Sequence, residues 1–260
     1  MQLNGTLATQ DQLKALALTN YGHFTSMLIE DNRVRGLALH MQRLARDSRQ
    51  LFDADLDTEQ VRAYIRAALT DQPQPTVVRV TVYDPSLDLG SIGGEAQPQV
   101  LITTRAASTS PPGAWRLQAV SYQRDIPSIK HVGLFGAMKR RRDAQREGFD
   151  DVLFLNKDGT ISEIATSNIG CIRDGQIIWP RSEWLTGVTM TLLNQELDEP
   201  LASEPLTLTD LKAMEAVFAT NAATGVRPIA GVDNMEWPSA EHPMLAELRD
   251  SYAIIPGEVV

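Results

Sequence analysis

The spacing of apolar residues divides the first third of the chain into predicted strands and helices. Residues 23–29 carry mostly β-prone side chains and end in the polar turn 30–32, a pattern typical of a strand that enters a hairpin. Over residues 37–51, apolar side chains recur at spacings of three and four, which predicts a helix with one buried face. A second helix is predicted over residues 58–69, and β-branched side chains predict a strand at 76–83.

The next predicted strand is 99–104, and a linker follows it. Residues 105–113 are small and polar and contain a Pro-Pro-Gly turn, so they offer little to a core and favour an extended chain. From this boundary we predict three segments: an N-terminal domain at 1–106, a linker at 107–113 and a C-terminal domain at 114–260.

The second half of the chain contains two predicted hairpins. Residues 152–163 and 168–179 each hold two apolar runs on either side of a turn that contains glycine. The other predicted elements are strands at 115–122 and 216–220 and helices at 134–147, 188–197, 209–214 and 239–251. This order predicts an α+β N-terminal domain and a mixed α/β C-terminal domain, rather than a doubly wound parallel sheet.

Composition and charge narrow the class of protein. Of the 260 residues, 43% are hydrophobic and 22% are charged, which is typical of a globular protein. The formal net charge of −9 repels phosphate backbones, so we expect no nucleic-acid partner. No run approaches the roughly 18 apolar residues of a membrane span, and the N-terminus lacks a secretory pattern, so we expect a soluble protein with no membrane partner.

Few residues are available for redox or metal chemistry. Cys171 is the single cysteine, so it has no partner for an internal disulfide, which points to the reducing cytoplasm. Its strand-like neighbours predict a buried thiol rather than a nucleophile. The four histidines lie too far apart for zinc-ligand spacing, and we predict no metal.

Six short motifs follow one another along the chain: His40–Leu44, Ile129–His131, Ala144–Leu153, Asp158–Asn168, Leu185–Thr189 and Asn221–Ile229. Together they resemble the class IV, or fold-type IV, pyridoxal-phosphate enzymes, the family of branched-chain and D-amino-acid aminotransferases and aminodeoxychorismate lyase. Their common order is more specific than any one motif. The resemblance implies two domains with pyridoxal 5′-phosphate in the cleft between them, and a homodimer.

Lys130 has the chemistry that an aldehyde cofactor requires. A primary amine is needed to hold the aldehyde as a Schiff base and then to move protons. Lys130 ends a segment, 126–129, that we expect to enter the core, and partial desolvation there would lower the pKa of the amine. The resemblance places the Schiff-base lysine at this position.

Glu163 supplies a complementary acid. The resemblance implies that its carboxylate lies next to the pyridine nitrogen, where it favours the protonated ring and so a better electron sink. The polar run Thr166-Ser167-Asn168 after it suits the edge of a polar pocket.

Three segments are candidates for the cofactor phosphate. Gly187, Val188 and Thr189 open a predicted helix, where free N–H groups converge. Arg43 matches the phosphate-binding arginine of the family, and its fork of donors suits phosphate oxygens. The loop 221–225 can offer further backbone N–H groups.

The resemblance and these arguments assign the following cofactor-binding residues: Arg43, Lys130, Glu163, Asn168, Gly187, Val188, Thr189, Asn221 and Ala222. Lys130 is the catalytic residue among them. The substrate-binding candidates are Phe24, Ala223 and Thr224.

The favoured reaction is the transfer of an amino group from an amino acid or primary amine to a keto acid. Two alternatives stay open: aminodeoxychorismate lyase, which releases pyruvate and p-aminobenzoate, and a catalytically silent protein that binds pyridoxal phosphate or another anion. The chain departs from the family pattern at Thr186 and Met190 and lacks the carboxylate-binding arginine of D-amino-acid aminotransferases in residues 80–85. Arg79 precedes that stretch, and the alternation of side chains along a strand leaves its direction open.

Overall fold

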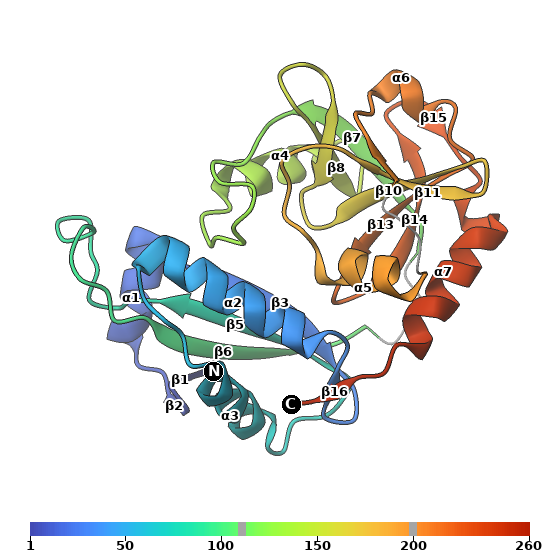
Figure 1. Cartoon of the computed structure of the whole chain (residues 1–260). Coiled ribbons are helices and arrows are strands. Elements are labelled where there is room, and N and C mark those ends of the chain that lie inside the picture. Colours follow the sequence, from blue (N-terminus) through green and yellow to red (C-terminus); the bar gives the residue numbers. More distant parts are fainter. Residues whose placement is uncertain (109–112, 198–201) are drawn as a thin grey trace. The chain divides into compact units, whose positions relative to one another are not determined.

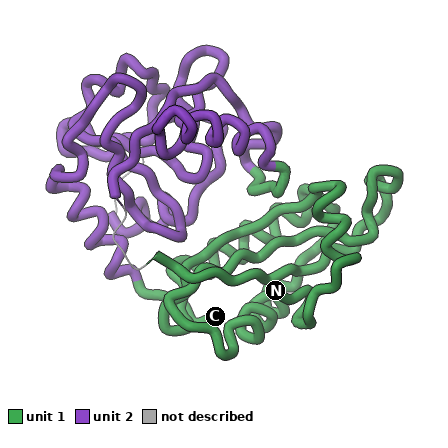
Figure 2. Tube along the Cα trace, turned by 180° about the vertical axis from the view of Figure 1, so that it is seen from behind, with its two compact units in different colours: residues 1–109, 129–133, 256–260 green, residues 110–128, 134–255 purple. Residues whose placement is uncertain are grey.

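The structure is a computed structural model that describes residues 1–108, 113–197 and 202–260. The chain forms two compact units, shown in Figure 2. Unit 1 comprises the described residues of 1–109 together with 129–133 and 256–260. Unit 2 comprises the described residues of 110–128 and 134–255. Residues 109–112 of the predicted linker lie outside the described residues.

Unit 1 is built on a five-stranded antiparallel sheet in the order β2-β1-β6-β5-β3. Its strands are β1 (Gln2–Leu3), β2 (Thr6–Leu7), β3 (His23–Ile29), β5 (Thr76–Tyr83) and β6 (Gln99–Ala106). A separate pair joins β4 (Arg33–Val34) to β16 (Glu258–Val259), so the end of the chain returns to unit 1. The helices are α1 (Gln10–Thr19), α2 (Leu37–Phe52) and α3 (Thr58–Leu69), labelled in Figure 1.

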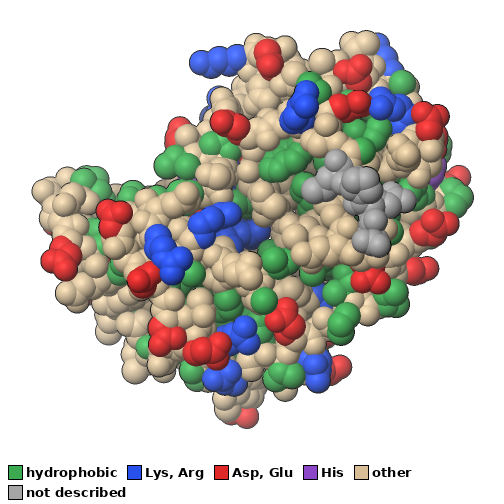
Figure 3. All heavy atoms as spheres, in the orientation of Figure 1, with side chains coloured by type: hydrophobic (Ala, Val, Ile, Leu, Met, Phe, Trp, Pro, Cys, Tyr) green, Lys and Arg blue, Asp and Glu red, His purple; other side chains and the backbone are tan. Residues whose placement is uncertain are grey.

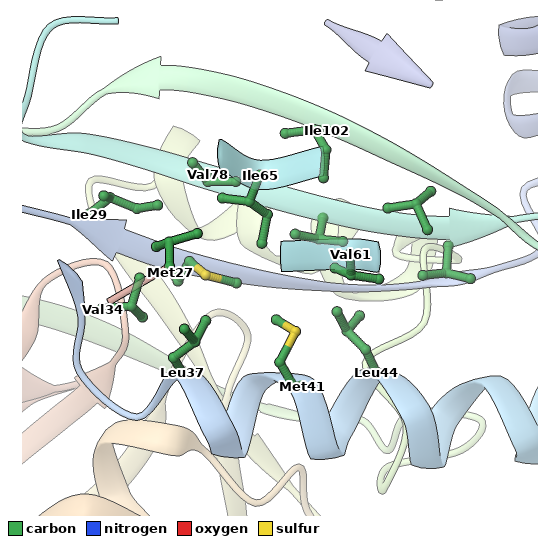
Figure 4. Close-up of a cluster of buried hydrophobic side chains, with 14 of the residues drawn as sticks. Met27, Ile29, Val34, Leu37, Met41, Leu44, Val61, Ile65, Val78 and Ile102 are labelled. Carbon is green, nitrogen blue, oxygen red and sulfur yellow. The ribbon is translucent and has the colours of Figure 1, made fainter. Parts of the chain in front are cut away.

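One face of this sheet holds the main core of unit 1. Apolar side chains of α2 and α3 point at Met27, Val78 and Ile102 of three neighbouring strands, as Figure 4 shows. Side chains alternate along a strand, so the next residues in line point to the other face, where Leu101 and Tyr83 pack with α1. The two faces of the sheet therefore pack against different helices.

A short segment from later in the sequence extends the sheet of unit 1. Phe24 N donates to Lys130 O at 2.9 Å, Val132 N donates to Gly22 O at 2.9 Å, and His23 pairs with His131 in an antiparallel bridge. Residues 129–133 therefore run beside β3. The predicted C-terminal domain, a continuous stretch at 114–260, differs from this division, because the hydrogen-bond partners of a strand need not be its sequence neighbours.

Unit 2 is built on a nine-stranded mixed sheet in the order β12-β11-β10-β13-β14-β7-β8-β9, with β15 added beside β14. The strands are β7 (Trp115–Ser121), β8 (Asp151–Leu155), β9 (Ile161–Ile164), β10 (Asn168–Arg173), β11 (Gln176–Pro180), β12 (Ala202–Glu204), β13 (Ala216–Asn221), β14 (Gly225–Val232) and β15 (Met235–Glu236). The helices are α4 (Phe135–Arg146), α5 (Val188–Glu196), α6 (Leu208–Leu211), the 3-10 turn η1 (Ser239–Glu241) and α7 (Pro243–Ile254). Parallel pairing occurs at β11/β12, β14/β7 and β7/β8.

Most predicted elements are confirmed, and the differences have local causes. The helix at 58–69 and the strand at 76–83 have the predicted bounds, and both hairpins form. The predicted helix 239–251 is divided before Pro243, which begins α7 because proline suits the first turn of a helix. Helix α1 was not predicted, since it buries no residue fully and so has a weak apolar pattern. The mixed α/β class is confirmed.

Two observations bear on partners. No helix within the described residues is long and apolar enough to cross a bilayer. On the face drawn in Figure 3, acidic and basic side chains both occur across the surface.

Candidate active site

Lys130 is anchored in unit 1 on both sides of its backbone. Its carbonyl accepts from Phe24 of β3, and its N–H donates to Oδ2 of the fully buried Asp47 at 3.3 Å. The preceding Ile129 is 3% exposed, whereas Ile126 is 45% exposed. The prediction that residues 126–129 enter the core therefore holds only at Ile129, next to the lysine. The amine nitrogen lies 5.0 Å from the centre of the Phe24 ring. The backbone is thus held while the amine rests on an aromatic surface.

Asp47 is a site residue that the sequence reasoning missed. Its Oδ1 accepts from Nε and Nη2 of Arg46 at 2.8 and 2.6 Å, while Oδ2 accepts from the Lys130 backbone. The signal for it was present, because Asp47 lies four residues after Arg43 and seven after His40, on one helical face. Asp47 connects α2 to the lysine segment.

Arg43 and His40 lie on the buried face of α2. Arg43 is 8% exposed, and burial, with a smaller effect of Arg46, lowers its pKa to about 10 against the opposing effect of Asp47. Nδ1 of His40 lies 2.6 Å from Thr25 Oγ1, while its Nε2 is buried and has no hydrogen-bond partner among the described residues. Burial and the charges of Arg43 and Lys130 hold the pKa of His40 well below its ordinary value. This face therefore offers a buried cation beside a neutral imidazole.

Glu163 lies on β9 in unit 2 and is 3% exposed. Its Oε1 is 2.8 Å from Nε of Arg124, whose own side chain is 5% exposed. Nη2 of Arg124 donates to the carbonyl of Ala165 at 2.8 Å, which fixes the guanidinium against the strand end. The carboxylate is buried with its counter-charge. Arg124 is a second residue that sequence reasoning missed, and its isolated position gave no signal.

A second buried acid lies nearby in unit 2. Oδ2 of Asp151 accepts from Thr166 Oγ1 at 2.7 Å and lies 3.3 Å from Nε of Arg141. Burial raises the pKa of Asp151, against the charges of Arg141 and Arg124 and its hydrogen bonds. Two acids and two arginines thus alternate along this part of the unit.

The start of α5 packs directly on Asn168. Nδ2 of Asn168 donates to the carbonyl of Leu185 at 2.8 Å. A Cβ on Gly187 would lie 2.1 Å from Asn168 Oδ1, so any larger residue here requires the Asn168 side chain or the start of α5 to shift. Val188 and Thr189 then begin the helix and are buried. The predicted Asn168, Gly187, Val188 and Thr189 are therefore brought together.

The loop after β13 is shaped by Asn221. Its Oδ1 accepts from Ala223 N, Thr224 N and Thr224 Oγ1, each at 3.0 Å, and its Nδ2 donates to Ser167 Oγ at 3.0 Å. The Asn221 side chain therefore orders its own loop, including Ala222. Thr220 was not predicted, and its buried Oγ1 has no partner among the described residues. Ser167 belongs to the polar run 166–168 that the sequence indicates as the edge of a polar pocket.

The predicted residues fall into two sets. Phe24, Arg43 and Lys130 lie in unit 1, and Lys130 contacts Phe24. The rest lie in unit 2, where Asn168 pairs with Thr220 across β10 and β13, so that the loop 221–224 and the start of α5 both adjoin Asn168. Ile164 pairs with Ser167, which brings Glu163 to the same strand ends.

Cys171 is buried on β10, as predicted. Its relative exposure is 0%, and burial raises the pKa of the thiol to about 12. A thiol of this kind is a weak nucleophile. Within the described ranges, no group of three or more His, Cys, Asp or Glu side chains is placed to hold a metal ion.

The sequence matches the family model "Amino-transferase class IV" over residues 22–232, which span both units. A curated relative, the "Probable branched-chain-amino-acid aminotransferase" of Rickettsia bellii, is 25% identical over 276 residues, covering 97% of this chain and 94% of that protein. Other curated branched-chain and D-alanine aminotransferases match over stretches that span 35% to 52% of their own length.

Solved structures share the fold. The branched-chain aminotransferase of the archaeon Thermoproteus uzoniensis, solved with norvaline, has a TM-score of 0.83 at 21% identity, covering 97% of this chain and 92% of that one. The 4-amino-4-deoxychorismate lyase of Pseudomonas aeruginosa has a TM-score of 0.79 at 23% identity, covering 96% of each chain.

Proposed function

The chain belongs to the class IV aminotransferase family, and from this premise we propose that it transfers an amino group from an amino acid or primary amine to a keto acid. The family match confirms the predicted class of enzyme and supports pyridoxal phosphate as its cofactor. The likeness to solved structures confirms the fold-type IV prediction. The observation that carries the residue assignment is the anchored Lys130, whose amine lies over the Phe24 ring.

The residues present fit the cofactor. Arg43 is a buried cation, and the buried Nε2 of His40 beside it lacks a partner among the described residues, which suits an anionic group such as a phosphate. In unit 2 the start of α5 has a glycine, Gly187, where a Cβ would contact Asn168 Oδ1, and helix N-termini bind phosphates. When bound, pyridoxal phosphate supplies an aldehyde and an electron-withdrawing ring.

Lys130 is proposed to act at two atoms. Its amine nitrogen would hold the aldehyde of the cofactor, and as a free base the same nitrogen would accept the proton that leaves the substrate α-carbon. The bonds from Phe24 and to Asp47 hold the lysine backbone in place through both steps. Only the side chain has to move.

Glu163 is proposed to accept a hydrogen bond from the protonated ring nitrogen. For this the carboxylate must stay ionised although it is buried, and burial alone favours the neutral acid. The Arg124 guanidinium, 2.8 Å away, opposes that effect. Arg124 is therefore a positioning residue that supplies the counter-charge of the buried Glu163 carboxylate.

The remaining predicted residues have binding roles in this proposal. The phosphate is proposed to be held by Arg43, by the start of α5 at Gly187, Val188 and Thr189, and by the loop from Asn221 and Ala222. Asn168 supports the start of α5. The proposed substrate-binding residues are Phe24, Ala223 and Thr224. The N–H groups of Ala223 and Thr224 donate to Asn221 Oδ1, which holds their loop in place.

We also propose a cytoplasmic homodimer, and we keep the domain bounds 1–106 and 114–260 as a proposal. The single cysteine supports a reducing compartment, and the dimer is expected from the family. Sedimentation of the purified protein tests the dimer, which predicts twice the 28.7 kDa mass of the chain.

A lyase reaction is the second candidate, favoured by the likeness to the P. aeruginosa aminodeoxychorismate lyase. One experiment separates the candidates. Purified protein with pyridoxal phosphate is given aminodeoxychorismate, with pyruvate and p-aminobenzoate as readout, and in parallel a panel of amino donors, with the visible absorption of the cofactor as readout. Spectral change with donors and its reversal by keto acids supports transamination. Pyruvate release supports the lyase, and no response in either arm supports a silent binding protein.

A further inference from the structure

Helix α2 of unit 1 begins without a capping side chain of its own. Its N-cap residue is Gly36, which has a φ of 71° and makes no side-chain capping bond. The first turn of α2 also contains no acidic residue. The first N–H groups of a helix have no partner within the helix, so they need acceptors from outside it.

An acceptor for this end of α2 comes from Glu258, much later in the sequence. Both carboxylate oxygens of Glu258 accept from Ala38 N, each at 3.2 Å, across a separation of 220 residues. A carboxylate at the start of a helix also faces the positive end of the helix dipole, which is the favourable orientation. Glu258 therefore caps α2 from outside the helix.

The short segment that carries Glu258 is held on both sides of that residue. Strand β16 pairs with β4 (Figure 1), and Gly257 O accepts from Arg33 Nη1 at 2.8 Å. Val260 N donates to Asn32 O at 3.1 Å, and the Val260 side chain packs in the same core as α2. These anchors fix the backbone of Glu258 beside the first turn of α2.

The capped turn leads directly to the buried face of α2 that carries the proposed phosphate ligands. His40 follows Ala38 by two residues, and His40 N donates to Gly36 O at 3.1 Å, which closes the first turn. Arg43 follows three residues after His40, and both side chains are buried. Helix ends fray when their caps are lost, so removal of the carboxylate would loosen the backbone that holds these two side chains.

We propose that Glu258 is a positioning residue for the cofactor phosphate, because its cap on α2 holds His40 and Arg43 where the phosphate binds. The proposal rests on the proposed function, in which Arg43 binds that phosphate. Glu258 acts through the helix and not as a ligand, since its carboxylate accepts from Ala38 N and its negative charge repels a phosphate. Its loss should therefore weaken binding of a cofactor that carries a phosphate more than binding of one that lacks it.

Two substitutions test the cap. Glu258→Ala removes both acceptor oxygens, while Glu258→Gln keeps one acceptor oxygen and loses the charge. Glu247→Ala is the control, since Glu247 is an exposed glutamate on α7. Thermal unfolding of each variant establishes that it is folded, and if Glu258→Ala does not fold, Glu258→Gln carries the test.

The first readout compares pyridoxal phosphate with pyridoxal, which lacks the phosphate, by titration followed through visible absorption. We expect Glu258→Ala to weaken the binding of pyridoxal phosphate roughly 3- to 10-fold and to leave the binding of pyridoxal within about 2-fold. Glu258→Gln should lie between Glu258→Ala and the unchanged protein, and Glu247→Ala should match the unchanged protein. A merely structural role would weaken both compounds alike, so equal weakening, or none with pyridoxal phosphate, would overturn the proposal.

The second readout needs no cofactor. Amide hydrogen exchange in the first turn of α2, including Ala38 N–H, should be at least about 5-fold faster in Glu258→Ala than in the unchanged protein. Exchange in α3 should be the same in both proteins, and Glu247→Ala should change neither helix. Unchanged exchange at the start of α2 would overturn the proposal.

Failure of the proposed function is recognised separately. An unchanged protein that gains no absorption with pyridoxal phosphate or pyridoxal would defeat the proposed function. Inorganic phosphate, titrated by calorimetry, would then decide the role of Glu258. Weaker phosphate binding by Glu258→Ala than by the unchanged protein would support the positioning role, and equal binding would overturn it.

Discussion

The two units treat their buried charges in opposite ways. In unit 2, Glu163 and Asp151 each lie beside an arginine, so the charges of that part balance within the unit. In unit 1, the buried Asp47 is shared by Arg46 and the Lys130 backbone, while Arg43 and Arg79 add further positive charge. A balanced network fixes one carboxylate in place, whereas an excess of cations attracts anions. We infer that unit 1 supplies the positive side chains for anionic groups and that unit 2 supplies the carboxylate for the ring.

The largest effect should come from Lys130, the reacting group of unit 1. Lys130→Ala should lower turnover about 1,000-fold or more, because the amine and the proton transfer are both assigned to this side chain. The backbone bonds to Phe24 and Asp47 do not depend on the side chain, so thermal stability should change little. Lys139→Ala, on the exposed part of α4, is the matched control. Turnover of Lys130→Ala at the control's rate would refute the assignment.

The balanced network of unit 2 should be the most sensitive to loss of one partner. Arg124→Leu leaves the Glu163 carboxylate buried without its counter-charge, which should cost about 3–5 kcal/mol in the free energy of unfolding. The double variant Arg124→Leu/Glu163→Leu should regain part of that loss. Denaturant unfolding measures both.

The control for this prediction is an exposed ion pair of unit 1. Arg49 and Asp55 are 64% and 84% exposed, so Arg49→Leu should cost less than about 1 kcal/mol. A loss for Arg124→Leu no larger than that of Arg49→Leu would show that the network of unit 2 is not held by charge.

A smaller effect is expected where unit 2 meets the phosphate in the proposed site. Gly187→Ala places a Cβ against Asn168 Oδ1, so the start of α5 must shift, at a cost of about 1–3 kcal/mol. Cofactor affinity, measured by fluorescence titration, should fall with it. Gly93→Ala is the control, because a Cβ there meets no atom within 4 Å. Equal cofactor affinity in the two variants would exclude this contact.

The pH dependence of stability should distinguish the units by sign. The pKa of His23 is lowered from 6.5 to about 3, chiefly by burial, and that of His40 is also lowered. Between pH 6.5 and about pH 3, a histidine of the unfolded chain binds a proton that the folded chain does not bind. The free energy of unfolding therefore falls as pH falls, by about 1.4 kcal/mol per pH unit for each histidine. Asp151 of unit 2 has a raised pKa, and its contribution runs in the opposite direction.

Unfolding of His40→Asn between pH 6.5 and pH 4 tests this prediction. As pH falls, the free energy of unfolding of the variant should decrease less steeply than that of the unchanged protein. The difference between the two slopes should correspond to about one bound proton. An unchanged slope would mean that His40 is protonated in the folded state.

The sequence predicted the parts of the site that are local in the chain. The hairpin around Asp158–Gly159 leads to Glu163, and the start of α5 at Gly187 has the expected bounds, because turn chemistry and apolar spacing are short-range signals. Asp47 and Arg124 were missed, since each acts through a partner far away in sequence, Lys130 and Glu163 respectively. The pairing of residues 129–133 with β3 could not be predicted either, because strands far apart in the sequence pair without leaving a periodic pattern. The direction of Arg79 was left open by the sequence and is settled by its register with Ser26.

The central claim is that Lys130 carries the cofactor. Borohydride reduction of the protein with pyridoxal phosphate bound, followed by peptide mapping, tests it directly, because reduction makes the bond to the reacting lysine permanent. The account predicts a single labelled residue, Lys130. A label on Lys14, Lys139, Lys157 or Lys212 in its place would contradict it.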